Sequence, residues 1–369
     1  MTAPMMQPLE RLSRSLLRKR IEKLASAIEG LWSLAKEGRL AWLVHFVRCR
    51  FQYNLRALHS GVAMNRTRQG DLYNFRRNIH RIEKGLLHKL PKAAFAEDYI
   101  WETISYLAQI KSSGASDANT NAWGEAVLDH YFMTCNHTQT VAEAYALYRK
   151  LEPQNRQPTW YPYPVRHRPD LAVEYEDLYQ LALRRRSVRQ YLDRTVEFDQ
   201  VEKAMRVAAL SPSACNRQSF KFLFYNKKEI VREISQIPGG FVGFEVPSII
   251  VVVGSYRGYF DERDANVPTI DASLAAMAFL FALESLGLSS VCLNWPALPD
   301  RDEALRRLIH LEDDEFVVML IGIGYPDPAG KIPYSAKRDI HSLIQFNERL
   351  EPNGPGAVLP AEKMAVPID

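Results

Sequence analysis

Four arginines and a serine lie within six residues in the segment Arg184-Arg185-Arg186-Ser187-Val188-Arg189. Guanidinium groups bind phosphate through paired N–H donors, and a serine hydroxyl or backbone N–H groups can complete such a site. The segment follows an apolar-periodic stretch, so we expect it at the junction of a helix and a loop. A run of charge more commonly faces water. The segment therefore has two interpretations, a solvated basic turn or a built anion site.

A second segment, Ser211-Pro212-Ser213-Ala214-Cys215-Asn216-Arg217-Gln218, is a loop of small and amide residues after an expected helix. A flat heteroaromatic ring such as isoalloxazine needs amide and backbone partners at its polar edge. Its faces need small or apolar residues that allow close approach. Ser213, Ala214, Asn216 and Gln218 fit that description. We treat the two segments as one candidate site.

Motifs of several other chemistries are absent from the sequence. It contains no HExxH, no GxSxG and no GxxxxGK[ST], and its nine histidines are dispersed. Gly322-Ile323-Gly324 follows an expected strand but lacks the third glycine and the acidic residue of the dinucleotide fingerprint. The sequence therefore predicts no metal site, no hydrolase triad and no Rossmann cofactor site.

The elements that position both segments begin after a proline-rich stretch, because the four prolines of residues 153–164 cannot continue a helix. From residue 174 the pattern alternates between helices and strands. We expect helices at Tyr175–Arg185, Glu197–Leu210 and Asp271–Leu286, and strands at Ser219–Tyr225, Val246–Val253, Ser290–Leu293 and Phe316–Ile323. Gly287 should end the long, Ala-rich helix before it.

The first half of the chain is predicted to be helical, with no strand before residue 150. Basic amphipathic helices are expected within residues 9–58, and two further helices at Phe95–Lys111 and Asn121–Arg149. Residues 1–90 contain 18 Lys and Arg against 6 Asp and Glu, which leaves 29 against 37 in the other 279 residues. This part should therefore meet something anionic, such as a membrane surface, a nucleic acid or the acidic remainder of the protein.

These patterns divide the chain into four regions: a basic helical region (1–152), a proline-rich linker (153–173), an α+β domain (174–350) and a flexible tail (351–369). The four scattered cysteines are typical of reduced thiols. The sequence shows no secretory signal, and no run approaches the ~20 apolar residues of a membrane span. We expect a cytoplasmic protein, with peripheral contact between residues 9–58 and the inner membrane face as an alternative.

The C-terminal half, about 174–345, resembles the nitroreductase family of FMN-dependent oxidoreductases. Four blocks carry the resemblance in the family's order: RRSVRQY (185–191), the loop from Ala209 to Gln218, the helix from Asp271 to Leu288 with Val291–Trp295, and VVMLIGIGYP (317–326) followed by Lys337-Arg338. The resemblance implies an α+β fold with a mixed sheet flanked by helices. It also implies a homodimer with FMN at each subunit interface, a small-molecule substrate and no nucleic-acid partner.

The resemblance also implies roles for individual residues. Contacts with the FMN phosphate and ribityl chain would come from Arg185, Ser187, Arg189 and Arg338, with Arg186 near the ring edge or phosphate. The partner subunit's loop would bring Pro212, Ser213, Ala214 and Asn216 to the ring, with Gln218 in the same loop. Leu293, Asn294 and Trp295 would lie near the ring. Hydride would pass from NAD(P)H through FMN to an unknown acceptor in a ping-pong sequence, so no catalytic side-chain acid or base is expected.

Three departures from the family pattern stand in this half. Ser219 follows Gln218 where the family usually has proline, which predicts a looser turn into the strand. Ala276-Met277-Ala278 replaces a common Gln-Asn pair, and the segment between Gly239 and Val246 is too short for a helical lid.

The first half lies outside the family pattern. Its HRIEKGL segment (80–86) could cover the flavin cleft, with His80, Arg81 and Lys84 as candidate substrate contacts. The alternative to an enzyme is a dimeric scaffold that the basic helices recruit to an anionic membrane or a polysaccharide-assembly partner.

Overall fold

The structure is a computed structural model of the whole chain. It describes residues 71–87, 94–114, 116–154, 156–259, 264–296, 298–344 and 346, with a few positions between 23 and 55. The predicted helices of residues 9–58 and the predicted tail lie outside the described residues, apart from those few positions. Residues 1–330 form one compact unit and residues 331–369 a second. The sequence-based division into four regions remains a prediction.

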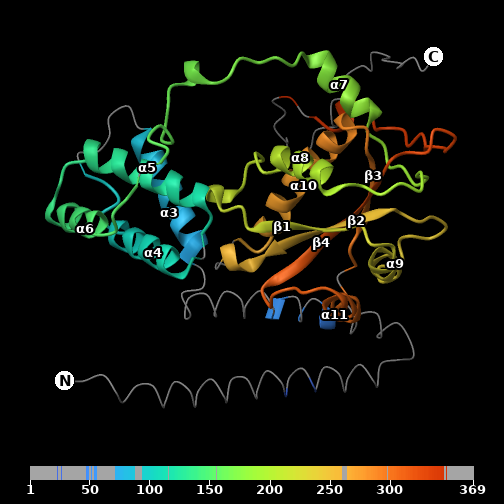
Figure 1. Ribbon diagram of the computed structural model, residues 1–369, viewed down its shortest axis with the longest axis horizontal. Coiled ribbons are helices and arrows are strands. Elements are labelled where there is room, and N and C mark those ends of the chain that lie inside the picture. The colour runs from blue at the N-terminus through green and yellow to red at the C-terminus, as the bar shows by residue number, and fades with distance from the viewer. Residues whose placement is uncertain are drawn as a thin grey trace, which may run out of the picture. The chain divides into compact units, whose positions relative to one another are not determined.

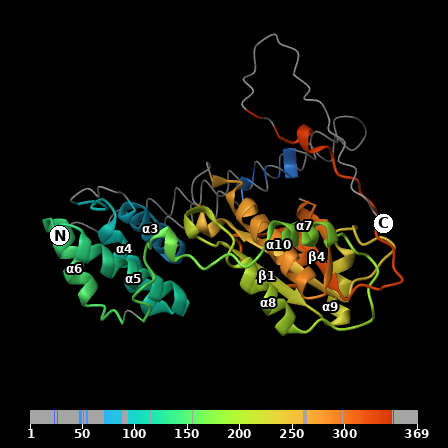
Figure 2. The same cartoon turned by 90° about the horizontal axis from the view of Figure 1, so that it is seen from above.

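The described part of the first half is a bundle of four helices: α3 (Asp71–Leu86), α4 (Ile100–Ser113), α5 (Ala118–Thr134) and α6 (Gln139–Arg149). Figure 2 shows these helices packed together. On α3, the side chains of Phe75, Ile79 and Ile82 share one face and are fully buried in the bundle core. No strand occurs among the described residues before 150, as predicted.

The sequence predicted one helix over Asn121–Arg149, and this was wrong. The chain breaks at residues 135–138, and a new helix begins at Gln139. Thr138 is the N-cap of α6, and its hydroxyl accepts a hydrogen bond from the Val141 N–H at 3.4 Å. A threonine at this position satisfies an N–H group that the first helical turn leaves unpaired, which favours a fresh start.

The second half combines helices and strands in the predicted order, so the α+β class is confirmed. Its elements are α7 (Tyr175–Arg184), α8 (Phe198–Ala208), β1 (Phe220–Tyr225), α9 (Lys228–Gln236), β2 (Ser248–Ser255), α10 (Val267–Ser285), β3 (Ser289–Asn294), α11 (Pro299–Leu308) and β4 (Glu315–Gly324). The strands form one sheet in the order β1-β2-β4-β3, and every pair is antiparallel. Among the described residues the parallel pairing that makes the sheet mixed is the isolated bridge Ser187–Ser290.

The sheet is covered on both faces, and β2 shows how. All eight of its residues are buried, and successive side chains point to opposite faces. Ile250 and Val252 pack in the core that α8 and α10 complete, whereas Ile249, Val251 and Val253 pack with α9 and α11. Figure 1 shows α8 and α10 on one side of the sheet and α9 and α11 on the other.

Helix α10 lies in the core and spans the region between the two candidate segments. Its start at Val267 is earlier than predicted, because Pro268 suits the first turn of a helix and does not interrupt it. After its end, Gly287 has φ +77°, as expected of a glycine that terminates a helix. By length and composition alone α10 could cross a membrane, which the sequence reading overlooked. However, 56% of its apolar window is buried within the protein, as in the core helix of a globular domain.

The second unit is described up to residue 344 and at 346. It contains a short 3-10 helix at Ile340–Ser342, and the Asp339 carboxylate accepts a hydrogen bond from the His341 N–H at 2.7 Å.

Candidate functional site

The basic segment is fixed against strand β3. The buried Val188 donates its N–H to the Ser290 carbonyl at 3.0 Å, and Ser187 forms the parallel bridge to the same residue. The tyrosine that ends the segment, Tyr191, donates its hydroxyl to the Val188 carbonyl at 2.7 Å. The segment is therefore a structured edge of the sheet.

The arginines of this segment differ in their contacts. Arg184 pairs through Nε with Oε1 of Glu284 at 3.1 Å, and that carboxylate is 5% exposed. Burial raises the pKa of Glu284, and the positive charges of Arg184 and Arg185 oppose the rise. Arg189 is exposed and donates through Nη1 to the Ser187 carbonyl at 3.3 Å. Arg185 and Arg186 are half-buried. Arg184 is thus paired with a buried carboxylate of α10, whereas the guanidinium of Arg189 is exposed to solvent.

Leu293, Asn294 and Trp295 lie at the other end of β3, the strand with which the segment pairs. Leu293 is buried against Gly240, where an added Cβ would lie 2.7 Å from a Leu293 methyl carbon. The Trp295 indole N–H donates to the carboxylate of Asp302 in α11 at 2.7 Å, so this N–H group already has a partner within the protein. Asn294 is exposed.

The small-residue loop has an unusual backbone for a segment without glycine. Cys215, Asn216 and Gln218 have φ values of +53°, +51° and +54°. Within the loop, the Asn216 N–H donates to the Ser213 carbonyl at 2.9 Å, and the Gln218 N–H donates to the Ser213 hydroxyl at 3.1 Å. Left-handed φ is disfavoured for side chains with a Cβ, so contacts outside the loop must hold it.

One such contact comes from Asp271, the fifth residue of α10. The Asp271 carboxylate, 3% exposed, accepts the Ala214 N–H at 3.0 Å and the Tyr259 hydroxyl. Arg217 is also buried, pairs with Asp264 at 3.4 Å and lies over the Tyr259 ring at 4.8 Å. A buried polar group therefore supports the loop from the side of the sheet.

The transition from loop to strand is ordered, which corrects the expectation of a loose turn at Ser219. Ser219 is fully buried, and its hydroxyl donates to the Ser255 carbonyl at 2.9 Å. The Ser255 N–H returns a hydrogen bond to the Ser219 carbonyl at 3.0 Å. Serine thus provides a hydrogen bond at a position where proline could not.

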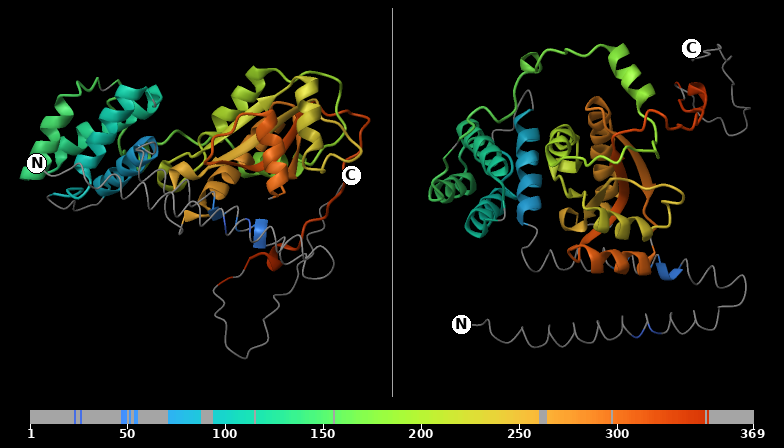
Figure 3. Two further views of the ribbon diagram at one scale, coloured as in Figure 1. Left: turned by 90° about the horizontal axis from the view of Figure 1, so that it is seen from below. Right: turned by 45° about the vertical axis from the view of Figure 1, so that its right-hand side comes forward.

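Helix α3 of the bundle reaches the same loop through Arg76, a residue that the sequence analysis missed. Arg76 donates through Nε to the Asn216 carbonyl at 2.8 Å and through Nη2 to the Gln218 side-chain carbonyl at 2.9 Å. Figure 3 shows α3 as the bundle helix nearest the sheet, in agreement with its contacts to the loop before β1 and to the turn after β2. The available signal was an arginine directly beside the buried Phe75 on an amphipathic helix.

Substrate contact by His80, Arg81 and Lys84 of α3 remains a prediction. His80 lies 3.4 Å from the Glu83 carboxylate, and Arg81 pairs with Asp98 at 3.7 Å while covering the Tyr99 ring at 3.6 Å. Lys84 is exposed. The contacts of His80 and Arg81 are therefore with other residues of the bundle, whereas Arg76 contacts the loop.

Comparison with known proteins identifies the region that contains both segments. The nitroreductase family model matches residues 182–240 and 238–325. The C-terminal half of this chain is nitroreductase-like. The bundle of α3 to α6 lies outside the matched residues.

Two relatives and one solved structure each match less than half of the chain. An inferred NADH dehydrogenase/NAD(P)H nitroreductase from Methanothermobacter thermautotrophicus is 29% identical over 161 residues, which cover 42% of this chain and 81% of the relative. A protein of the same name from Archaeoglobus fulgidus is 28% identical over 152 residues, which cover 41% of this chain and 86% of the relative. An FMN-dependent nitroreductase from Clostridium difficile is 26% identical, with a TM-score of 0.39, and the match covers 46% of this chain and 98% of that one.

Within one nitroreductase-like half, the two candidate segments lie far apart. Asp271 holds the small-residue loop at the start of α10, and Glu284 holds Arg184 near the end of the same helix. Thirteen residues of helix separate them, which corresponds to about 20 Å at 1.5 Å per residue. A single chain therefore does not bring the arginines and the loop together as one compact site.

A cavity of about 1080 Å³ adjoins the basic segment. Its lining includes Tyr191, α9 and the segment 239–247, which contains no helix, as its length predicted. Arg189 lies 5.8 Å from the ring of Phe244, one of the lining residues. Burial raises the pKa of Tyr191, so the phenol remains neutral near this space. No cluster of metal-ligating side chains occurs in the part of the chain that the structure describes.

Arg338 belongs to the second unit. Its Nη2 donates to the Ser342 carbonyl at 3.3 Å, and its side chain is exposed. Its predicted contact with the phosphate remains a prediction.

Proposed function

We propose that the protein is an FMN-dependent oxidoreductase that accepts hydride from NADH or NADPH and reduces a second small molecule. The observation that carries the proposal is the basic edge containing Arg185, Ser187 and Arg189, which is fixed beside the start of β3. This edge lies within the residues that match the nitroreductase family. The similarity to an FMN-dependent nitroreductase supports the choice of cofactor.

The donor set suits a flavin mononucleotide. Arg189 is exposed, and its one hydrogen bond within the described residues goes to a backbone carbonyl, so several guanidinium N–H groups are available for a phosphate. The half-buried Asn216 side chain has no hydrogen-bond partner in the same part of the chain, so its amide could serve a ring edge. In contrast, the Gln218 amide already contacts Arg76 and the Ala209 carbonyl.

Bound FMN would supply two-electron chemistry, with hydride entering from a reduced nicotinamide and leaving to the second substrate. The residues of the chain would bind and orient it. Arg185, Ser187 and Arg189 would hold the phosphate, and the loop containing Ser213, Ala214 and Asn216 would approach the ring. The cavity beside Arg189 gives room for a substrate, while the neutral Tyr191 adds no charge to it.

We further propose that the site forms between two copies of the chain. The separation of about 20 Å along α10 keeps the basic edge and the loop apart within one copy. Helix α10 also exposes Ile270, Leu274 and Met277 at 52%, 45% and 39%, at helical spacings of four and three. An apolar stripe on an otherwise buried helix suits a second copy of the same surface, which would place one chain's loop against the other's arginines.

Flavin content tests the cofactor assignment. The purified protein should show flavin absorbance, lose it on anaerobic addition of NADH or NADPH, and regain it with an electron acceptor. Arg185→Ala should weaken FMN binding by tenfold or more, because hydrogen bonds to charged groups contribute about 1.5–3 kcal/mol. Arg206→Ala is the matched control, since Arg206 is an exposed arginine of α8 that pairs with Glu202 at 2.9 Å. Protein that cannot be reconstituted with FMN would refute the assignment.

Leu274→Glu tests the shared site. A charge in the centre of the apolar stripe should convert the dimer to a monomer in light scattering after size exclusion, and FMN affinity should fall with it. A monomeric variant that binds FMN as tightly as the wild type would show that the site forms within one chain.

A further inference from the structure

The loop between α8 and β1 cannot hold its shape by its own residues. Cys215, Asn216 and Gln218 all adopt left-handed backbone conformations that only glycine enters without steric cost. Two hydrogen bonds to Ser213 and one from the Arg217 N–H to the Ala214 carbonyl close the loop internally, and none of the three uses the Asn216 carbonyl. The conformation therefore depends on what packs against it.

Arg76 of α3 supplies that external support with all three of its guanidinium nitrogens. Nε donates to the Asn216 carbonyl at 2.8 Å, Nη2 to the Gln218 side-chain oxygen at 2.9 Å, and Nη1 to the Thr120 hydroxyl at 2.7 Å. The rigid fork of the guanidinium thus spans the loop on one side and α5 on the other. Arg76 is only 9% exposed, so water does not compete for these bonds.

Arg76 is itself held by the bundle. Thr120 passes its hydrogen on to the Asp117 carboxylate at 2.8 Å, which sets its oxygen to accept from Arg76. The guanidinium also lies 5.1 Å from the centre of the Trp123 ring. Its neighbour Phe75 packs so closely on Gly124 that a Cβ there would lie 2.3 Å from the phenyl ring. The bundle core therefore fixes the position of the residue that contacts the loop.

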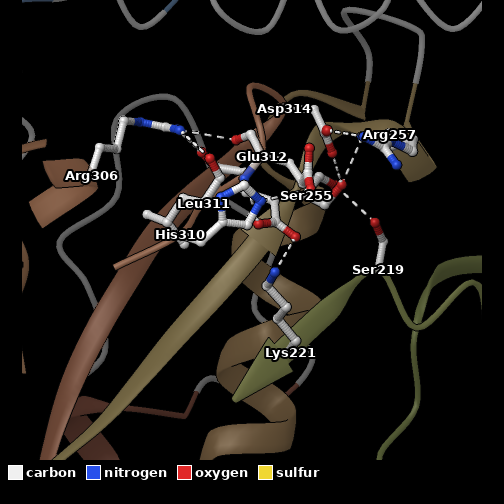
Figure 4. Close-up of polar contacts among 10 residues, drawn as sticks. Ser219, Lys221, Ser255, Arg257, Arg306, His310, Leu311, Glu312 and Asp314 are labelled. Carbon is white, nitrogen blue, oxygen red and sulfur yellow. Dashed lines mark hydrogen bonds and ion pairs between the residues drawn. The ribbon is translucent and has the colours of Figure 1, made fainter. Parts of the chain in front are cut away.

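The end of the loop has a second set of contacts with the same helix and with the sheet. Tyr73, three residues before Arg76, lies near the end of the loop, because its ring and the Ser219 side chain are both within 3.7 Å of a Cβ added at Gly258. Ser219 in turn donates to the Ser255 carbonyl, and the Ser255 hydroxyl contacts Asp314, as Figure 4 shows. The loop is thus held at its middle by Arg76 and at its end by this network.

We propose that Arg76 is a positioning residue of the flavin site, through which the helical bundle sets the conformation of the loop from Ser213 to Gln218. The proposal rests on the proposed function, in which this loop approaches the flavin ring. It assigns a role to the bundle of α3 to α6, which lies outside the residues that match the nitroreductase family. The bundle is then a structural part of the catalytic unit.

Arg76→Met tests the proposal, because methionine retains apolar bulk and removes all three donors. Lys111→Met is the matched control: Lys111 pairs inside the bundle with the buried Glu125 at 2.8 Å and does not contact the loop. Hydrogen exchange of the protein without flavin should be at least tenfold faster at the Asn216 and Gln218 amides in Arg76→Met. These amides should exchange at the wild-type rate in Lys111→Met.

Binding of FMN supplies the second readout. The dissociation constant for FMN should rise at least tenfold in Arg76→Met and remain unchanged in Lys111→Met. Arg76→Lys should fall between the wild type and Arg76→Met, because an ammonium group cannot span the three acceptors. Equal FMN affinity and equal exchange in the wild type and Arg76→Met would overturn the proposal.

Two further outcomes keep the tests distinct. If the wild type binds no FMN, the proposed function fails, while the exchange measurement still decides whether Arg76 holds the loop. If Arg76→Met unfolds the bundle, seen as faster exchange in α4 to α6, Gln218→Leu removes one of the two loop partners of Arg76 and leaves the bundle intact. Faster exchange confined to the loop in Gln218→Leu would support the proposal, and unchanged exchange there would overturn it.

Discussion

Asp271 at the start of α10 supports the small-residue loop from the sheet side, and removing its carboxylate should destabilise the protein. Its Oδ2 accepts the Ala214 N–H at 3.0 Å and the Tyr259 hydroxyl, and the side chain is 3% exposed. Asp271→Ala leaves both donors inside the protein without an acceptor. Asp271→Asn keeps an oxygen in place for them.

The size of the loss follows from the two orphaned donors. Each buried donor without a partner costs about 1–3 kcal/mol, so Asp271→Ala starts from a loss of about 2–6 kcal/mol. Part of this is offset, because burial raises the pKa of Asp271 and the wild type therefore bears a cost for the buried charge. We expect a net loss of about 2–4 kcal/mol for Asp271→Ala and less than about 1 kcal/mol for Asp271→Asn at neutral pH.

The pH dependence has a definite sign. Burial, only partly opposed by Tyr259, Ala214 and Arg217, raises the folded-state pKa of Asp271 above the reference value of 3.8. Between these two pKa values the folded state binds more protons than the unfolded state, so stability falls as pH rises through that window. Asp271→Asn lacks this titration. Its stability relative to the wild type should therefore improve as pH rises from below 3.8 through the folded-state pKa.

Urea unfolding followed by tryptophan fluorescence measures these differences, with the three proteins compared at several pH values on both sides of the window. The reasoning would be refuted if Asp271→Ala and Asp271→Asn unfolded at the same urea concentration at neutral pH. It would also fail if the stability difference between wild type and Asp271→Asn were independent of pH.

Three further substitutions, with a fourth as a control, test the fold by the same unfolding measurement. Gly287→Ala should cost about 1–2 kcal/mol, because φ is +77° there and the open space around it leaves only backbone strain; no loss would contradict that φ. Tyr148→Phe should cost about 1–2 kcal/mol, since the buried hydroxyl donates to Asp129 at 2.9 Å, and a neutral result would argue against that bond. Phe279→Ala should cost about 3–5 kcal/mol from the core, whereas Phe198→Ala, at a site 64% exposed, should change stability by less than about 0.5 kcal/mol.

The sheet and its covering helices were predictable because the spacing of apolar residues along the sequence shows which segments bury one face. The apolar run Val246–Val253 predicted a strand, and such continuous runs are typical of strands buried on both faces; all of β2 is buried. The order of elements from residue 174 follows from the same kind of pattern. Boundaries shifted by a few residues where caps such as Pro268 or Thr138 decide the start of a helix.

The support of the loop was not predictable, because it depends on contacts between distant parts of the chain. Arg76 and Asn216 are 140 residues apart, and an arginine on an amphipathic helix is usually solvated. Cys215 and Gln218 have left-handed backbone conformations, and neither is a glycine, the residue that would have predicted such a conformation from the sequence. The sequence instead predicted substrate contacts at His80, Arg81 and Lys84. These residues lie on the same basic helix as Arg76, and the sequence pattern does not distinguish them from it.

The arrangement of supports gives the two candidate segments different dependence on the first half of the chain. The basic edge is fixed by β3 and by Glu284, both within the nitroreductase-like half. The loop is fixed partly by Arg76, from the bundle. If two copies share each site, the bundle of one copy then acts on the flavin whose phosphate the other copy binds. A change in the bundle would consequently alter the ring side of the proposed site, whereas the proposed phosphate contacts of Arg185 and Arg189 would remain.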